Sequence, residues 1–138
     1  MDREVIEQKL ESLRRCLQRV AEKCPSDPAT LGRDPDLQDI VTLNLSRAVQ
    51  LCVDLGAHLI ADLDVVPPDT MGQTFDTLAH AGVIPEPLAQ QLKKAVGFLN
   101  IAVHNYEVID WAIVHGIALN HASDFSEFAK VIASRLAR

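Results

Sequence analysis

Two carboxamides, an imidazole and a phenol lie close together in an otherwise apolar stretch of the chain, as Asn100, Asn105, His104 and Tyr106. Polar groups in such surroundings cost free energy unless they are paired, exposed or used. His104 matters most, because an imidazole can act as a general acid or base. The stretch therefore indicates either a reaction site or a contact surface.

The helical period would extend this cluster along one face of a helix. Residues spaced three or four apart share a helix face, and the following side chains keep that spacing: Lys93, Gly97, Asn100, His104, Glu107 and Trp111. On this face Asn100 can hydrogen-bond the imidazole or a bound phosphate, and Glu107 can orient the ring. The alternative is a contact surface, in which Asn100 satisfies His104 and Tyr106 packs with its hydroxyl bonded.

The spacing of the other chemical groups indicates neither a metal site nor a nucleophile. A bundle that holds two metal ions needs Glu-x-x-His on each of two helices, whereas here His104 precedes Glu107 and the long helix before it offers only Asp54 and His58. No serine or cysteine neighbours His104 in sequence. Three cysteines without CxxC spacing indicate neither zinc nor disulfides: Cys16, Cys24 and Cys52. We expect no metal and no cofactor, and metal analysis would test the di-metal alternative.

The bulk properties of the chain indicate one globular domain spanning residues 1–138, without a membrane segment. The 138 residues are 48% hydrophobic and 23% charged, and no apolar run approaches the roughly 18 residues that span a bilayer. No signal-peptide core follows Met1, so we expect a cytoplasmic protein. A net charge of −6 argues against nucleic-acid binding by the whole surface. It leaves room for a local basic cleft, for which Arg47, Gln50 and Asp54 share one side of an expected helix.

Hydrophobic periodicity predicts an all-α bundle of about five helices. Apolar stripes at helical spacing end at prolines or glycines, which places the helices at residues up to about 24, then about 37–63, 71–82, 85–115 and 123–138. The stretch 25–36 carries three prolines and a glycine, so we expect a loop there. Capping residues are expected at Asp69 or Thr70 and at Ser123 or Asp124. The second helix has two adjacent stripes, which indicates burial on two sides.

Several short motifs, in this order and spacing, resemble the HepT-like family of HEPN proteins. They run along most of the chain: Asp34-Pro-Asp-Leu-Gln-Asp39, Val49-Gln-Leu-Cys-Val-Asp54 followed by His58, Gly82-Val-Ile-Pro85, Gly97-Phe-Leu-Asn100 and His104-Asn-Tyr106. The resemblance implies an all-helical homodimer in which motifs from two subunits face each other across a cleft. It also implies metal-independent cleavage of RNA by the toxin of a type VII toxin–antitoxin pair. The implied antitoxin is a small MNT-type nucleotidyltransferase, which silences the toxin by attaching AMP to the motif tyrosine.

The resemblance assigns roles to individual residues and exposes one departure from the family motif. His104 would be the catalytic histidine, Asn100 the polar residue beside the active arginine, and Tyr106 the AMP acceptor. The family arginine stands five positions before the histidine, where this chain has Leu99. Leucine cannot grip a phosphate with two hydrogen bonds or stabilise charge in a transition state. We therefore expect ribonuclease activity to be reduced or absent.

The sequence does not decide how Leu99 arose, and it is compatible with two functions. Leu99 lies on an apolar helix stripe, so it can be the native residue of a divergent, inactive family member. The other origin is a deliberate inactivation of a toxic ribonuclease, which the intact remainder of the motif favours. The alternative function is a non-catalytic helical subunit that binds a nucleotide or a nucleotidyltransferase through the same face. Cleavage assays separate the two functions, because only the ribonuclease hypothesis predicts that a restored arginine brings activity.

Overall fold

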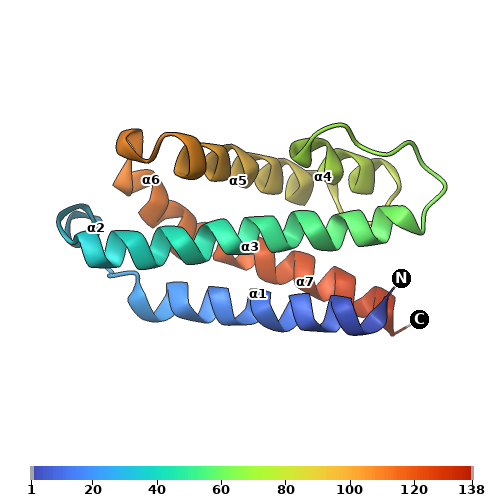
Figure 1. The fold of residues 1–138 in the computed structure, drawn as a ribbon, viewed down its shortest axis with the longest axis horizontal. Helices are drawn as coiled ribbons and strands as arrows, with labels where there is room; N and C mark the ends of the chain where they lie inside the picture. Colours follow the sequence, from blue (N-terminus) through green and yellow to red (C-terminus); the bar gives the residue numbers. More distant parts are fainter. Residues whose placement is uncertain (1, 138) are drawn as a thin grey trace.

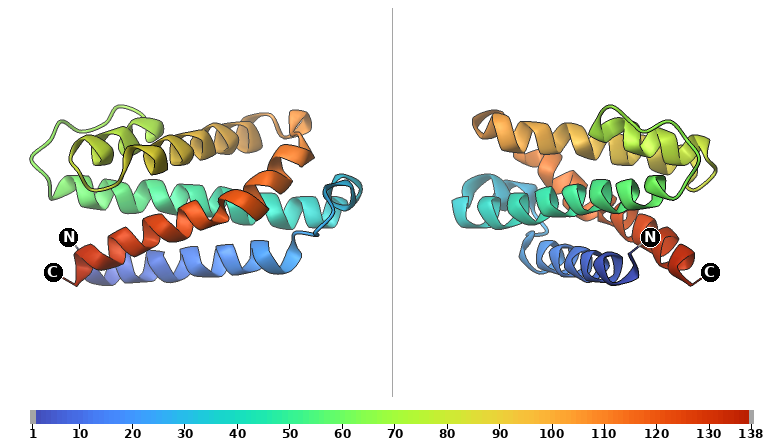
Figure 2. Two further views of the ribbon diagram at one scale, coloured as in Figure 1. Left: turned by 180° about the vertical axis from the view of Figure 1, so that it is seen from behind. Right: turned by 45° about the vertical axis from the view of Figure 1, so that its right-hand side comes forward.

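The long helices of this computed structural model, which describes residues 2–137, pack side by side along their lengths (Figure 1). Helix α3 (Pro35–Ala61) lies in the middle, with α1 (Arg3–Lys23) on one side and α5 (Glu86–His104) on the other. Helix α7 (Ala122–Leu136) crosses behind them and brings the two ends of the chain together (Figure 2). The described residues contain no strand, so the all-α prediction is confirmed. No helix among them is long and apolar enough to cross a membrane.

The helix ends follow from local capping chemistry. The Asp34 carboxylate accepts hydrogen bonds from the first backbone amides of α3, and Pro35 occupies the first helical position, where its missing N–H costs nothing. The hydroxyl of Thr70 caps α4 (Met71–His80), as one of the two predicted residues. Gly82 follows this helix with φ +76°, a backbone conformation that glycine adopts without strain. These boundaries agree with the predicted ones within a few residues.

The core forms around α3, which is buried along two sides as its double stripe predicts. At its centre the rings of Phe75 from α4 and Phe128 from α7 meet edge to face, with centroids 5.6 Å apart. Both helices press against α3 at Gly56, where an added Cβ would lie 2.7 Å from Cγ2 of Thr74. Only a glycine therefore permits this close approach.

Two predicted boundaries were wrong. The expected loop at 25–36 contains a short helix, α2 (Pro28–Arg33), because Asp27 accepts a hydrogen bond from the backbone N of Ala29 and Pro28 fits the first turn. The fourth helix ends at His104 instead of near residue 115. The prolines of 25–36 suggested a loop, but proline also occurs at the start of helices. The apolar spacing after His104 suggested a longer helix, but this spacing persists across the turn.

The chain turns sharply after His104. Asn105 leaves the helical region with φ −151° and ψ 57°, and a 3-10 turn follows at Tyr106–Val108. Helix α6 (Trp111–Gly116) then begins anew, because the Asp110 carboxylate accepts a hydrogen bond from the backbone N of Ala112 at 2.9 Å. A π-helical turn, Ile117–His121, leads directly from α6 into α7. The predicted cap at Ser123 or Asp124 was therefore wrong, since both residues lie inside the helix.

Candidate active site at the end of α5

Helix α5 separates the motif residues into a buried and an exposed set. Leu99 packs in the core with Leu92 and Ala95, and only 6% of its surface is exposed. Asn100 and His104 point away from this core and are exposed. The phase of the helix thus places Leu99 inside, at the position where the resemblance leads us to expect an arginine. It leaves the polar motif residues on the surface.

The two polar motif residues of α5 are unpaired. Neither the Asn100 carboxamide nor the His104 imidazole makes a hydrogen bond or ion pair with any residue in the range 2–137. The prediction of one continuous helix face from Lys93 to Trp111 was wrong, because Glu107 and Trp111 lie beyond the turn that ends α5. Lys93 lies on α5 but pairs with Asp76 of α4 at 3.0 Å. Asn100 and His104 are therefore left available for a ligand or a second protein.

Tyr106 is held against α3 across the turn. Its hydroxyl donates a hydrogen bond to Oδ1 of Asp39 at 2.7 Å, and its ring contacts Trp111 edge to face at 5.7 Å. The residue is still 38% exposed. Burial of the phenol, together with the hydrogen bond and negative charge of Asp39, raises the pKa of Tyr106 to about 12. Tyr106 itself lies outside α5, because the helix ends at His104.

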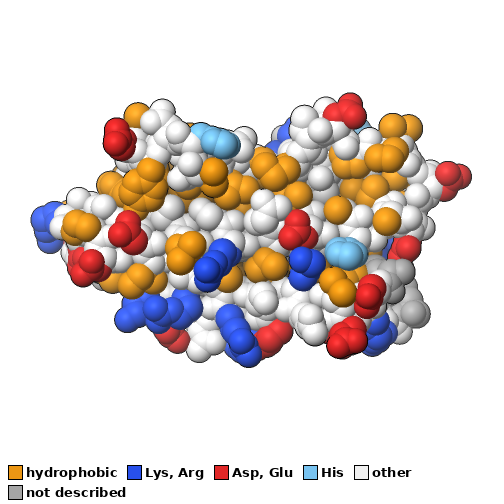
Figure 3. All heavy atoms as spheres, in the orientation of Figure 1, with side chains coloured by type: hydrophobic (Ala, Val, Ile, Leu, Met, Phe, Trp, Pro, Cys, Tyr) orange, Lys and Arg blue, Asp and Glu red, His pale blue; other side chains and the backbone are white. Residues whose placement is uncertain are grey.

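Large apolar side chains are also exposed on α5 and on α3. Val103 is 63% exposed and Leu43 of α3 is 50% exposed. Figure 3 shows hydrophobic side chains gathered over α3 and α5 on the face that carries both helices. Large apolar side chains that remain exposed near unpaired polar groups are typical of a protein–protein contact surface.

A groove between α1 and α3 carries positive charge. Its volume is about 680 Å³, and Arg15, Arg19 and Arg47 line it together with Gln50 and Asp54. The three arginines and one aspartate give it a formal charge of +2, whereas the whole chain carries −6. Lys and Arg side chains lie along α1 and α3 in Figure 3. Arg47, Gln50 and Asp54 share one side of α3, as predicted, and line this groove, in which Gln50 and Lys9 both bond the Asp54 carboxylate.

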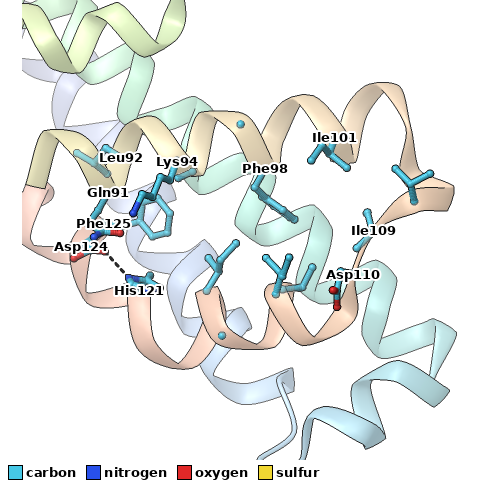
Figure 4. Close-up of a pocket in the computed structure, with 17 residues that line it drawn as sticks. Gln91, Leu92, Lys94, Phe98, Ile101, Ile109, Asp110, His121, Asp124 and Phe125 are labelled. Carbon is cyan, nitrogen blue, oxygen red and sulfur yellow. Dashed lines mark hydrogen bonds and ion pairs between the residues drawn. The ribbon is translucent and has the colours of Figure 1, made fainter.

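A second cavity, of about 590 Å³, lies between α5, α6 and α7 (Figure 4). Lys94 and the His121–Asp124 pair stand at one end, and Ile101 and Ile109 lie toward the other. Neither His104 nor Tyr106 lines this cavity. The polar motif residues Asn100, His104 and Tyr106 therefore do not line this cavity.

The remaining histidines and acidic residues form no metal site. Among residues 2–137 no three His, Cys, Asp or Glu side chains come close enough to hold an ion. His115 is buried, and its Nε2 lies 2.8 Å from the carbonyl oxygen of Pro25. His121 pairs with Asp124 at 3.1 Å. Both histidines are therefore paired within the fold.

Comparison with known proteins assigns the chain to a family. The model of the ribonuclease HepT-like family matches residues 4–132. The chain belongs to this family. This HepT-like chain is 34% identical to the mRNA nuclease HepT of Shewanella oneidensis over 129 residues, which cover 94% of the chain and 96% of that protein. The family is one of toxin–antitoxin ribonucleases.

Solved structures with the same fold include toxin–antitoxin complexes. A toxin–antitoxin structure with AMP-PNP contains a chain that matches the HepT-like chain with a TM-score of 0.89 and 33% identity, covering 95% of this chain and 98% of that one. A tri-AMPylated HEPN toxin of Shewanella oneidensis in complex with its MNT antitoxin matches with a TM-score of 0.88 and 34% identity, over 97% and 98% of the two chains. The HEPN-like fold predicted from the motifs is thereby confirmed.

Sequence reasoning missed one residue of this site. Asp39 contacts the hydroxyl of Tyr106 although 67 positions separate them in the chain. Asp39 closes the motif that opens α3, but nothing in its spacing links it to the motif of α5. Only the packing of α3 against the turn after His104 brings the two side chains together.

Proposed function

We propose that this chain is the toxin of a toxin–antitoxin pair, with the active site of a homodimeric, metal-independent ribonuclease that Leu99 leaves reduced or silent. The observation that carries the proposal is the arrangement at the end of α5. Asn100 and His104 are exposed and unpaired, and the buried Leu99 stands where the family arginine is expected. The relative named mRNA nuclease HepT supports RNA as the substrate class.

The chemistry assigned to His104 is general base catalysis. Its imidazole would take the proton of a ribose 2′-hydroxyl, whose oxygen then attacks the adjacent phosphorus while the bond to the 5′-oxygen breaks. Asn100 would donate a hydrogen bond to the phosphate. His104 of the partner subunit would protonate the leaving 5′-oxygen. The products are a 2′,3′-cyclic phosphate and a free 5′-hydroxyl, and no metal takes part.

Leu99 removes the strongest phosphate contact from this scheme. An arginine would hold the phosphate with two hydrogen bonds and stabilise the charge that grows on it. Loss of such a donor typically raises the barrier by about 2–4 kcal/mol, which slows the reaction about a hundredfold or more. The alternative function, a non-catalytic subunit that binds a nucleotidyltransferase through the same face, is favoured by this same residue. A restored arginine distinguishes the two.

The homodimer is supported by the surface around the motif. Val103 exposes apolar area next to His104 on α5, Leu43 exposes more on α3, and the mechanism needs two imidazoles on one phosphate. A second copy would cover the apolar side chains and bring the two motifs together. Asn100 and His104 would then line the cleft instead of facing bulk solvent.

Control of the toxin is assigned to Tyr106 and an MNT-type nucleotidyltransferase antitoxin. A relative of 34% identity is described as tri-AMPylated and in complex with an MNT antitoxin. Tyr106 is exposed just after the helix that carries His104. An AMP group there would place bulk and negative charge beside the phosphate site, which repels RNA.

AMPylation can be tested directly, because Tyr106 is the only tyrosine in the chain. When the chain is co-expressed with an MNT-type antitoxin, intact-mass measurement is expected to show one or more added AMP groups. The variant Tyr106→Phe is expected to show none, because its ring has no oxygen to accept the phosphoryl group. Equal modification of both chains, or of neither, would refute AMPylation of Tyr106.

The positively charged groove between α1 and α3 is proposed to bind RNA. Arg47 lines this groove and makes no ion pair within residues 2–137. Arg47→Ala is expected to weaken binding of single-stranded RNA and to lower the slope of log affinity against log salt concentration by about 0.7, as loss of one phosphate contact does. Arg33→Ala, which removes an exposed arginine of α2 outside the groove, is the control. Equal effects of the two changes would assign the binding to overall charge instead of the groove.

A further inference from the structure

The hydrogen bond between Tyr106 and Asp39 joins a candidate nucleophile to a carboxylate. The phenol oxygen lies 2.7 Å from Oδ1 of Asp39, and both residues are exposed. The contact of the Tyr106 ring with Trp111 holds the phenol in this direction. The carboxylate therefore belongs to the same protein as the tyrosine and is already in place before any partner binds.

A neutral phenol is a poor nucleophile, and the phenol of Tyr106 loses its proton less readily than usual. Burial and the negative charge of Asp39 raise the pKa of Tyr106 to about 12. Very little phenolate is present near neutral pH, so transfer of a phosphoryl group to this oxygen requires a base that removes the proton during attack. The groups that stand near Tyr106 are Asp39 from α3, His104 and Glu107 along the chain, and Asp110, whose carboxylate already caps α6.

We propose that Asp39 is the general base for AMPylation of Tyr106, so that the toxin supplies a catalytic residue for its own modification. The inference rests on the proposed function, in which Tyr106 accepts AMP from ATP. Protein kinases offer the same chemistry, since an aspartate accepts the proton of the hydroxyl that attacks a nucleotide phosphate. Here the aspartate comes from the modified protein instead of the transferase.

The step balances as a single displacement. The oxygen of Tyr106 forms a bond to the α-phosphorus of ATP, and the bond from that phosphorus to the oxygen shared with the β-phosphate breaks. Pyrophosphate leaves with the electron pair of the broken bond. The proton of the phenol passes along the existing hydrogen bond to Oδ1 of Asp39, from which water later removes it.

Thr42, one turn further along α3 than Asp39, is placed to stabilise the phenol oxygen of Tyr106 during the transfer. Its Oγ1 is buried without a hydrogen bond to any described residue, which is unusual for a buried hydroxyl. The same hydroxyl lies near enough to Tyr106 to oppose the rise in its pKa, because it favours the negatively charged oxygen. As the proton moves to Asp39, Thr42 can donate a hydrogen bond to the charge that develops on the phenol oxygen.

The test measures the rate of AMP transfer from MgATP by an MNT-type nucleotidyltransferase that modifies the unaltered chain. Asp39→Asn keeps the shape and hydrogen-bonding ability of the side chain but cannot take the proton, so the rate near neutral pH is expected to fall about a hundredfold or more. Asp39→Glu is expected to recover part of the rate. Asp36→Asn, which removes an exposed carboxylate from the first turn of the same helix, is the control and is expected to leave the rate unchanged.

The direction in which Asp39→Asn changes the rate of AMP transfer shows whether Asp39 acts as a base or only restrains Tyr106. If Asp39 only restrains Tyr106, its removal lowers the pKa of the phenol toward the ordinary value and frees the ring, so Asp39→Asn would be modified as fast or faster. That result would overturn the proposal. Thr42→Val is expected to slow transfer about tenfold, as loss of one hydrogen bond does.

The pH profile provides a readout that a structural role would not change. With Asp39 as the base, the rate is expected to vary little between about pH 6.5 and 9, whereas in Asp39→Asn it should rise roughly tenfold per pH unit with the phenolate fraction. Both profiles are repeated in His104→Ala, so that this neighbouring imidazole cannot account for a difference between them. Parallel profiles would overturn the base role. No modification of the unaltered chain by any MNT-type enzyme would instead refute the proposed control of Tyr106.

Discussion

Leu99→Arg is expected to raise RNA cleavage about a hundredfold or more over the unaltered chain, because the guanidinium supplies the missing phosphate contact and transition-state stabilisation. Asn100 and His104 are already exposed on the same helix as position 99. The long stem of arginine can fill the space of the leucine while its charged end reaches the surface. Cleavage is measured on purified protein with single-stranded RNA under a range of protein concentrations, since the proposed active unit is a dimer.

The matched control for this change is Leu99→Lys. Lysine brings the same charge but only a single ammonium group, so it cannot grip a phosphate with two parallel hydrogen bonds. Its gain in cleavage is expected to be much smaller than that of arginine. Both variants place a charge at a position with 6% exposure, and each is expected to lower the free energy of unfolding by about 1–3 kcal/mol. Equal cleavage by the two variants would contradict the role assigned to the guanidinium.

Phe128→Ala is expected to have the largest effect on stability. Its ring is fully buried between α7 and α4 and meets Phe75 edge to face. Removal of a buried phenylalanine side chain typically lowers the free energy of unfolding by about 3–5 kcal/mol, since the lost contacts leave a cavity. Urea denaturation followed by circular dichroism measures this change.

The control for the core variant is Val66→Ala, because Val66 is 85% exposed. Its effect on the free energy of unfolding is expected to stay within about 0.5 kcal/mol. If Phe128→Ala were as mild as Val66→Ala, the packing of α7 and α4 against α3 described above would be incorrect.

The helices could be predicted from the sequence where apolar spacing and capping residues agreed. The two stripes of α3 and the cap at Thr70 before α4 are both found in the structure. The end of α5 could not be predicted in this way, because Tyr106, Ile109 and Ile113 continue its apolar spacing across the turn. Asn105 and Asp110 were the available signals, since asparagine is poor within a helix and aspartate is a common cap.

The candidate site could be predicted only in part. Helix phase alone indicates that Leu99 is buried when Asn100 and His104 are exposed, and the structure agrees. Residue types and spacing indicated Asn100, His104 and Tyr106 as candidates, whereas their individual roles came from the family resemblance. The contact of Tyr106 with Asp39 depends on how α3 packs against the turn after α5, and no local pattern carries that information.

The most direct test of the silenced active site compares Leu99→Arg with the double variant Leu99→Arg/His104→Ala on one RNA and on its copy with a 2′-deoxy nucleotide at the cleavage site. We expect Leu99→Arg to cut only the ribose substrate and to leave a 2′,3′-cyclic phosphate, which mass spectrometry of the products identifies. The double variant is expected to be at least a hundredfold slower. Failure of Leu99→Arg to cut RNA, or equal cleavage with and without His104, would contradict the account.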